Sequence, residues 1–77
     1  MITGMQVRAA KALLNWSGSD LARKAGIGIS TIRRIEACDG VLQEASIKTL
    51  KSIKEALEAG GVEFIGTPDH QPGVRLK

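Results

Sequence analysis

Apolar residues recur at the three- to four-residue spacing of an α-helix in four stretches of the chain. These stretches predict helices over residues 3 to about 15, 17 to about 26, 29 to about 37 and 46 to about 59. In the fourth stretch, the residues that share one face are Ile47, Leu50, Ile53 and Leu57. We expect that face to line the core, and the Gly-Gly pair at 60–61 to end the helix.

Polar residues that begin helices stand directly before these stretches. Thr3 with Gln6, and again Ser17 with Asp20, fit a capping box, in which two side chains satisfy free backbone N–H groups at the start of a helix. Gly26 suits the left-handed conformation that ends a helix. The second helix is therefore expected to be short and to be followed by a sharp turn.

The end of the chain changes from the helical period to the alternation that is typical of strands. Residues 62–65 and 74–77 alternate, and the glycines and prolines of residues 66–73 between them predict a turn. In a hairpin, the apolar residues of both strands would share one face, and Glu63 would oppose Arg75 or Lys77.

This pattern predicts a mostly α fold. A compact domain of four helices would cover residues 1–60, and a short C-terminal β-hairpin or strand pair would cover residues 61–77. A chain of 77 residues buries only about 60% of the surface that its unfolded form exposes. One cysteine and one histidine cannot form a disulfide framework or a four-ligand zinc site, so we expect a second copy of the chain to add stability.

Several classes of protein do not fit the sequence. No apolar run approaches the about 18–20 residues of a membrane helix, and no N-terminal targeting signal is seen. There is no glycine-rich phosphate loop and no cluster of metal ligands, and the chain is too short to surround a substrate pocket. We expect a cytoplasmic protein that is not an enzyme and has no cofactor; a small-molecule ligand is not indicated.

Charge is distributed unevenly along the chain, whose formal net charge is +3. Residues 1–35 contain six basic residues and one acidic residue, for +5, whereas residues 36–77 contain five basic and seven acidic residues, for −2. Such asymmetry suggests a nucleic acid or another acidic partner for the first half of the chain.

The second and third predicted helices have the pattern of two helices that cross at a tight turn. Ala22 supplies the small residue at the crossing, and Gly26 stands in the turn. The apolar positions that would hold the two helices together are Leu21, Ala25, Ile27, Ile32 and Ile35. On these residues, the segment from 18 to about 37 resembles the helix-turn-helix of the lambda-repressor and Cro-like (XRE) family.

The flanking helices extend this resemblance over residues 3–59. It implies a compact helical DNA-binding domain, a role in transcription regulation, and a second motif helix that enters the major groove. It also implies binding as a dimer. For the dimer interface, the C-terminal strands and the fourth helix are open alternatives.

The predicted helix 29–37 has an exposed face opposite its buried isoleucines, near its N-terminus, where recognition helices read bases. The candidate base contacts are Ile29, Ser30, Arg33 and Arg34. Each arginine can grip guanine O6 and N7, and the serine can donate or accept. The isoleucine either presses on a thymine methyl group or is an incidental neighbour of a solvated arginine pair.

The N-termini of the second and third helices favour phosphate, because their free N–H groups and dipoles point toward it. The candidate phosphate contacts are Arg8, Ser17, Gly18, Ser19, Gly28 and Thr31. Ordinary helix capping is the alternative role for the serines, and a solvated surface charge is the alternative for Arg8. The XRE family often has glutamine where Gly18 stands and Ser or Thr where Gly28 stands, so this chain lacks two side-chain phosphate contacts.

Other residues have weaker indications. The resemblance implies an ion pair between Lys11 and Glu36, which would link the first helix to the end of the third. Trp16 is expected to pack at the junction of the first two helices. Cys38 is expected to be a bystander thiol rather than a redox switch, and His70 is given no role.

The leading hypothesis is a sequence-specific double-stranded DNA-binding transcriptional regulator, expected to be a repressor. Its homodimer would bind a pseudo-palindromic operator with half-sites about 34–36 Å apart. The alternative is a protein-interaction module, such as an antitoxin or antirepressor on the same fold. The two glycines at phosphate positions favour that alternative.

Overall fold

The helices and strands follow the boundaries that the sequence pattern predicts, with one extension in the hairpin. The computed structural model describes residues 2–37, 47–67 and 70–77. Its elements are α1 (Gly4–Leu14), α2 (Gly18–Ala25), α3 (Ile29–Ala37), α4 (Ile47–Ala59), β1 (Val62–Thr67) and β2 (His70–Leu76). The predicted mostly α class with a C-terminal β-hairpin is confirmed.

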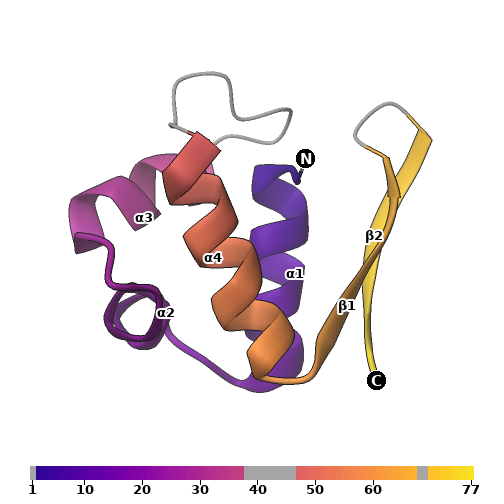
Figure 1. Ribbon diagram of the computed structural model, residues 1–77, viewed down its shortest axis with the longest axis horizontal. Coiled ribbons are helices and arrows are strands. Elements are labelled where there is room, and N and C mark those ends of the chain that lie inside the picture. The colour runs from indigo at the N-terminus through magenta and orange to yellow at the C-terminus, as the bar shows by residue number, and fades with distance from the viewer. Residues whose placement is uncertain (1, 38–46, 68–69) are drawn as a thin grey trace.

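Figure 1 shows α4 in front of α1, with α2 and α3 on one side of this pair and the hairpin on the other. α2 packs on α3 and α4, and α1 packs on α3. β1 and β2 both lie against α1. The hairpin is thus attached to the first helix, on the side of the molecule away from α2 and α3 (Figure 1).

Both predicted capping boxes are present. The Thr3 hydroxyl accepts the Gln6 N–H at 3.1 Å, and the Gln6 side chain accepts the Thr3 N–H at 2.8 Å. At the start of α2, the Ser17 hydroxyl accepts the Asp20 N–H at 3.0 Å, and the Asp20 carboxylate accepts the Ser17 N–H at 2.9 Å. Gly26 ends α2 in the left-handed conformation, with φ +70°. These local signals fix where α2 begins and ends, and they set the angle between α2 and α3.

One core joins all four helices to the hairpin. Its fully buried side chains include Val7 from α1, Leu21 from α2, Ile32 from α3, Ile53 from α4 and Val62 from β1. Since Val62 belongs to this core, the C-terminal extension is an integral part of the fold.

One core prediction for α4 is wrong. Leu50, Ile53 and Leu57 are buried, but Ile47 is 86% exposed. Ile47 is the first residue of the helix and lies almost one turn before Leu50, where the buried face of the helix begins. Ser46, where the sequence pattern predicts this helix to begin, and Cys38 lie outside the described residues.

The hairpin is antiparallel and longer than predicted. Val62 pairs with Leu76 and Phe64 with Val74, as expected. The expectation of a turn over residues 66–73 is wrong, because strand pairing continues to Thr67 and His70. A register shift between residues 65 and 67, with Gly66 at φ +74°, lets the glycine-rich sequence continue as strand.

Glu63 lies opposite Arg75, and the two side chains form an exposed ion pair. The guanidinium of Arg75 lowers the pKa of Glu63. Of the two partners that the alternation allowed for Glu63, the structure selects Arg75.

Gln6 connects the start of α1 to both strands. Its side chain is buried, and the residue is only 4% exposed. While Oε1 accepts the Thr3 N–H, Nε2 donates to the carbonyl of Gly73 at 3.0 Å and, at 3.5 Å, to that of Ile65. One amide thus caps α1 and fastens the hairpin to it.

Trp16 is half-buried and packs on the core. A Cβ atom added at Gly60 would lie 2.8 Å from two carbons of the indole ring, so the end of α4 approaches Trp16 as closely as only glycine allows. The ammonium of Lys24 lies 4.9 Å from the centroid of the same ring. Trp16 therefore joins the α1–α2 junction to the end of α4.

Candidate nucleic-acid interface

The exposed face of α3 carries most of the candidate base contacts. Ile32 and Ile35 are buried, which turns Ser30, Arg33 and Arg34 toward solvent. The two arginines and the serine therefore form one exposed polar patch on α3. The sequence prediction of their exposure is confirmed, and their contact with bases remains a prediction.

Ile29 does not share the exposure of its neighbours. It is half-buried and packs against the core, where its Cδ1 lies 3.7 Å from the position of a Cβ atom added at Gly18. The expectation that Ile29 belongs to the exposed face is therefore wrong. The isoleucine leans toward the start of α2, and this leaves less of it available to a thymine methyl group.

The start of α3 is formed by the backbone of Gly28. Its carbonyl accepts the N–H groups of Thr31 at 3.1 Å and Ile32 at 3.2 Å. Gly28 is exposed and Thr31 is half-buried. A Cβ atom added at Gly28 would meet nothing within 4 Å, so the site is open to solvent or to a ligand.

The start of α2 lies beside α3. Ser17 and Ser19 are exposed and Gly18 is half-buried. A Cβ atom at Gly18 would meet Glu36 Oε1 at 3.6 Å and Ile32 Cγ2 at 3.8 Å, which are ordinary contacts. The structure thus brings the predicted phosphate residues of α2 next to the helix that carries the predicted base contacts.

Asp20 places a negative charge in this region. Hydrogen bonds from the backbone N–H and the side chain of Ser17 lower the pKa of Asp20. The carboxylate already occupies one free N–H at the start of α2, so fewer donors remain there for a phosphate. Arg23 lies 3.3 Å from Asp20 Oδ1 and is exposed, and it is a cation of this surface that the sequence prediction left out.

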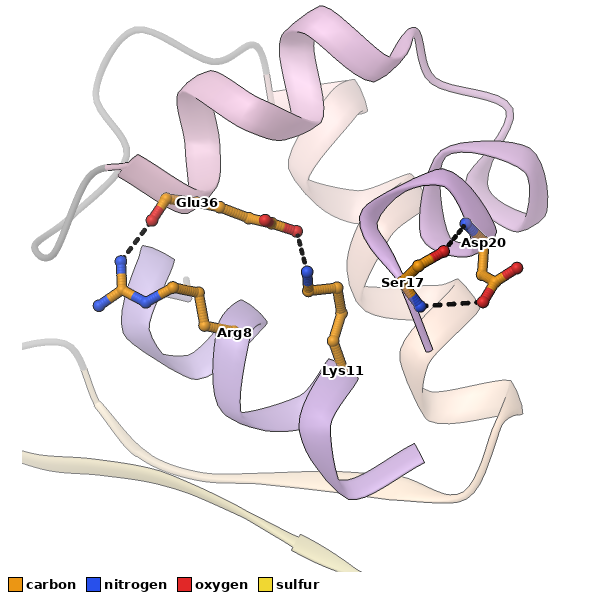
Figure 2. Close-up of polar contacts among 5 residues, drawn as sticks. All are labelled: Arg8, Lys11, Ser17, Asp20 and Glu36. Atoms are coloured by element: carbon orange, nitrogen blue, oxygen red, sulfur yellow. Dashed lines mark hydrogen bonds and ion pairs between the residues drawn. The ribbon is translucent and has the colours of Figure 1, made fainter. Parts of the chain in front are cut away.

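Glu36 is held from two sides by α1, as Figure 2 shows. The Nζ of Lys11 lies 2.7 Å from its Oε1, and the side chains are only 16% and 19% exposed. This ion pair, which the resemblance implied, is present. The contact is an ion pair rather than a well-directed hydrogen bond, since Oε1 has no partner with hydrogen-bond angles.

Arg8 lies elsewhere than expected. Its guanidinium donates to the backbone carbonyl of Glu36 (Figure 2). Glu36 is near the end of α3, whereas Gly28 directly precedes its start. Arg8 therefore hydrogen-bonds a carbonyl in the last turn of α3, where a cation also interacts favourably with the negative end of the helix dipole. Its expected position beside the N-termini of α2 and α3 is wrong, so its phosphate contact loses its geometric support.

Other features of the described residues define what the surface can do. No group of three or more His, Cys, Asp and Glu residues among them could hold a metal ion. Within the same residues, no helix is long and apolar enough to cross a membrane. The exposed residues of α3 and of the start of α2 carry hydroxyl and guanidinium groups, which are donors that bind phosphates and base edges.

A comparison with models of known protein families finds no match, and a comparison with curated proteins finds none either. The resemblance to the XRE family therefore stands on the residues named above.

Proposed function

We propose that the chain is a sequence-specific double-stranded DNA-binding transcriptional regulator that acts as a homodimer. In this proposal α3 enters the major groove, and Ser30, Arg33 and Arg34 read base edges. Ser17, Gly18, Ser19, Gly28 and Thr31 contact phosphates. The sign of regulation that we propose is repression, because a small DNA-binding domain can act simply by occupying its operator.

The observation that carries the proposal is the two-sided character of α3. Buried isoleucines fix the orientation of the helix, and two adjacent arginines with a serine stand on its exposed side. No acidic residue of α3 lies on that exposed side, because Glu36 turns toward Lys11. A rigid helix with bidentate donors on its free face is suited to reading guanine in the major groove.

Selection from random duplex DNA tests the proposal directly. We expect the wild-type chain to enrich one pseudo-palindromic sequence, and to lose affinity by about 10³–10⁵-fold between 50 and 200 mM salt if it makes six to ten phosphate contacts. Enrichment of no sequence by a correctly folded protein would refute the proposal.

The second candidate is a protein-interaction module, such as an antitoxin or antirepressor. Gly18 and Gly28 favour it, because neither residue has a side chain to offer a phosphate, and Asp20 adds a negative charge at the start of α2. Weak, salt-insensitive association with every duplex would favour this candidate over the regulator.

A further inference from the structure

The outward face of α1 is apolar along its whole length. Met5 is 48% exposed and Leu13 is 42% exposed, and Ala9 and Ala12 between them are exposed as well. The two cations of this helix, Arg8 and Lys11, are turned toward Glu36 of α3 and leave the face uncharged. A helix that is apolar on its solvent side as well as its core side is typical of a buried helix.

The other helices expose charged residues instead. Arg23 and Lys24 are exposed on α2, Arg33 and Arg34 on α3, and Lys48, Lys51 and Glu55 on α4. Among the described helices, α1 alone presents an exposed face without a charged side chain. This difference sets the α1 face apart as a surface that is suited to a partner.

From this difference we infer that the α1 face (Met5, Ala9, Ala12 and Leu13) forms the homodimer interface with a second copy of the chain. The spacing of its residues is self-complementary. Met5 and Leu13 lie four residues on either side of Ala9. An antiparallel pair of α1 helices with Ala9 at the two-fold axis sets Met5 against Leu13 of the partner subunit, and the reverse contact follows by symmetry.

Side-chain size and charge also favour a second copy. The alanines at the centre let the two helices approach closely, and the larger residues at each end fill the space beside them. Two copies of the α3 face would bring arginines together, and the exposed face of α4 carries two lysines and a glutamate that an interface would have to desolvate. The α1 face is free of such like-charge contacts.

The edge of β2 is less suited to pairing. Lys77 N–H donates to the Gly61 carbonyl at 2.8 Å, so residues 61 and 77 form a hydrogen-bonded pair of the hairpin. Such pairs alternate along an antiparallel ladder, so Glu63–Arg75 and Ile65–Gly73 also direct their backbone N–H and C=O groups toward each other. Pro72 then stands at an outward-facing position of β2, where it offers no N–H donor to another strand.

The dimensions of the molecule agree with such a dimer. Half-sites one turn apart require each α3 to lie about 17–18 Å from the two-fold axis. The molecule extends 29 × 27 × 19 Å, so a distance of that size lies within its dimensions. One helix face is a small interface, so we expect the dimer to have a dissociation constant in about the micromolar range. Binding of both subunits to one palindromic duplex would strengthen the dimer.

That the chain forms a homodimer is part of the proposed function. The location of the interface on α1 is a separate inference, which is tested without DNA. Sedimentation of the wild-type chain should show a monomer–dimer equilibrium. Ala9→Glu places two negative charges at the axis and should raise the dissociation constant by about 100-fold or more. Ile47→Glu on α4 and Leu76→Glu on β2 alter exposed residues outside the face and should leave the dimer intact.

A cross-link supplies the complementary readout. In a Cys38→Ser background, Ala9→Cys should form a disulfide between two copies under mild oxidation, because residues at the axis meet their own symmetry mates within disulfide reach. Lys51→Cys on α4, which is also exposed, should not. Circular dichroism checks that each variant is folded.

Three results would overturn the location. They are a wild-type chain that stays monomeric up to about 1 mM, a dimer that survives Ala9→Glu, and a dimer that is lost with Ile47→Glu or Leu76→Glu. If Ala9→Glu is monomeric but the wild-type dimer enriches no DNA sequence, the interface stands and the proposed function fails.

Discussion

Replacing Gln6 with glutamate would separate the two tasks of this side chain. In α2 of the same protein, Asp20 serves the capping box with a carboxylate, so an acid at the equivalent position of α1 can still accept the Thr3 N–H. Gln6→Glu removes only the amide group that donates to the carbonyls of Gly73 and Ile65. A buried carboxylate would then face two carbonyl oxygens.

The expected loss of stability is large for a domain of this size. A typical free energy of unfolding for 77 residues is about 4–12 kcal/mol. Loss of the donor and burial of a charge without a partner should cost about 3 kcal/mol or more at pH 7. Since 1 kcal/mol shifts the Tm of such a domain by about 4–8 °C, the Tm should fall by about 12–24 °C.

The loss should depend on pH. Burial raises the pKa of the new carboxyl group in the folded state above its unfolded value of about 4.3. The protonated form of Gln6→Glu is therefore favoured by folding, and its stability relative to wild type should recover as the pH falls from about 7 to 5. A protonated glutamic acid can again donate to one of the two carbonyls.

Thermal and urea unfolding of the wild type, Gln6→Glu and Thr3→Ala between pH 5 and 7 would measure these effects. Thr3→Ala is the matched control, because it removes the hydroxyl from the same capping box and leaves the amide donor in place; we expect it to cost about 1 kcal/mol with no pH dependence. A Gln6→Glu protein within about 1 kcal/mol of the wild type at pH 7 would show that the amide does not hold the hairpin.

Three further predictions concern the surface. Arg34→Ala should relax specificity at one base pair of the selected sequence and cost about 1–3 kcal/mol in binding, by competition titration; equal losses on every duplex would contradict base reading. A Cβ atom at Gly18 would make only ordinary contacts. Gly18→Gln should therefore be tolerated, and it should raise affinity for all duplexes by about three- to tenfold, with an unchanged salt slope because glutamine is neutral. Because the folded state lowers the pKa values of Asp20 and Glu63, both carboxylates contribute stability above their unfolded pKa of about 4, and this stability is lost as the pH falls through the lower folded pKa. Glu63→Gln should therefore lose less stability than the wild type in unfolding experiments from pH 6 to about 2. An equal loss of stability in the two proteins would count against the Arg75 pair.

The helix boundaries could be predicted because their causes are local. Thr3 and Gln6 lie three residues apart, as do Ser17 and Asp20, and each pair contains all the atoms of its own hydrogen bonds. Gly26 likewise needs only its own freedom to adopt a positive φ. Such features can be predicted because residues close in the sequence form all of their hydrogen bonds and turns.

The contacts between distant segments could not be predicted in the same way. Gln6 meets Ile65 and Gly73 across 59 and 67 residues of chain. Helical periodicity also gives the face of α4 that is buried, but the edge of the core depends on which elements pack beside it. This is why the pattern included Ile47 in the core although it is exposed.

The candidate site shows the same division. Helical periodicity was sufficient to predict that Ser30, Arg33 and Arg34 are exposed, because the buried isoleucines of α3 determine which side of the helix faces solvent. It could not place Ile29, whose partial burial depends on how the start of α2 packs beside α3. It also could not place Arg8, because an arginine has several partners within reach and only the folded arrangement selects the Glu36 carbonyl.

The close approach of Gly60 to Trp16 gives the protein an internal optical probe. Trp16 is the one tryptophan in the chain, and it lies where the α1–α2 junction meets the end of α4. Its fluorescence would therefore follow the packing of the helix-turn-helix segment on α4 without any added label. Since the candidate reading face carries no aromatic residue, a change in emission on adding DNA would signal a rearrangement inside the protein rather than stacking of the indole ring on a base.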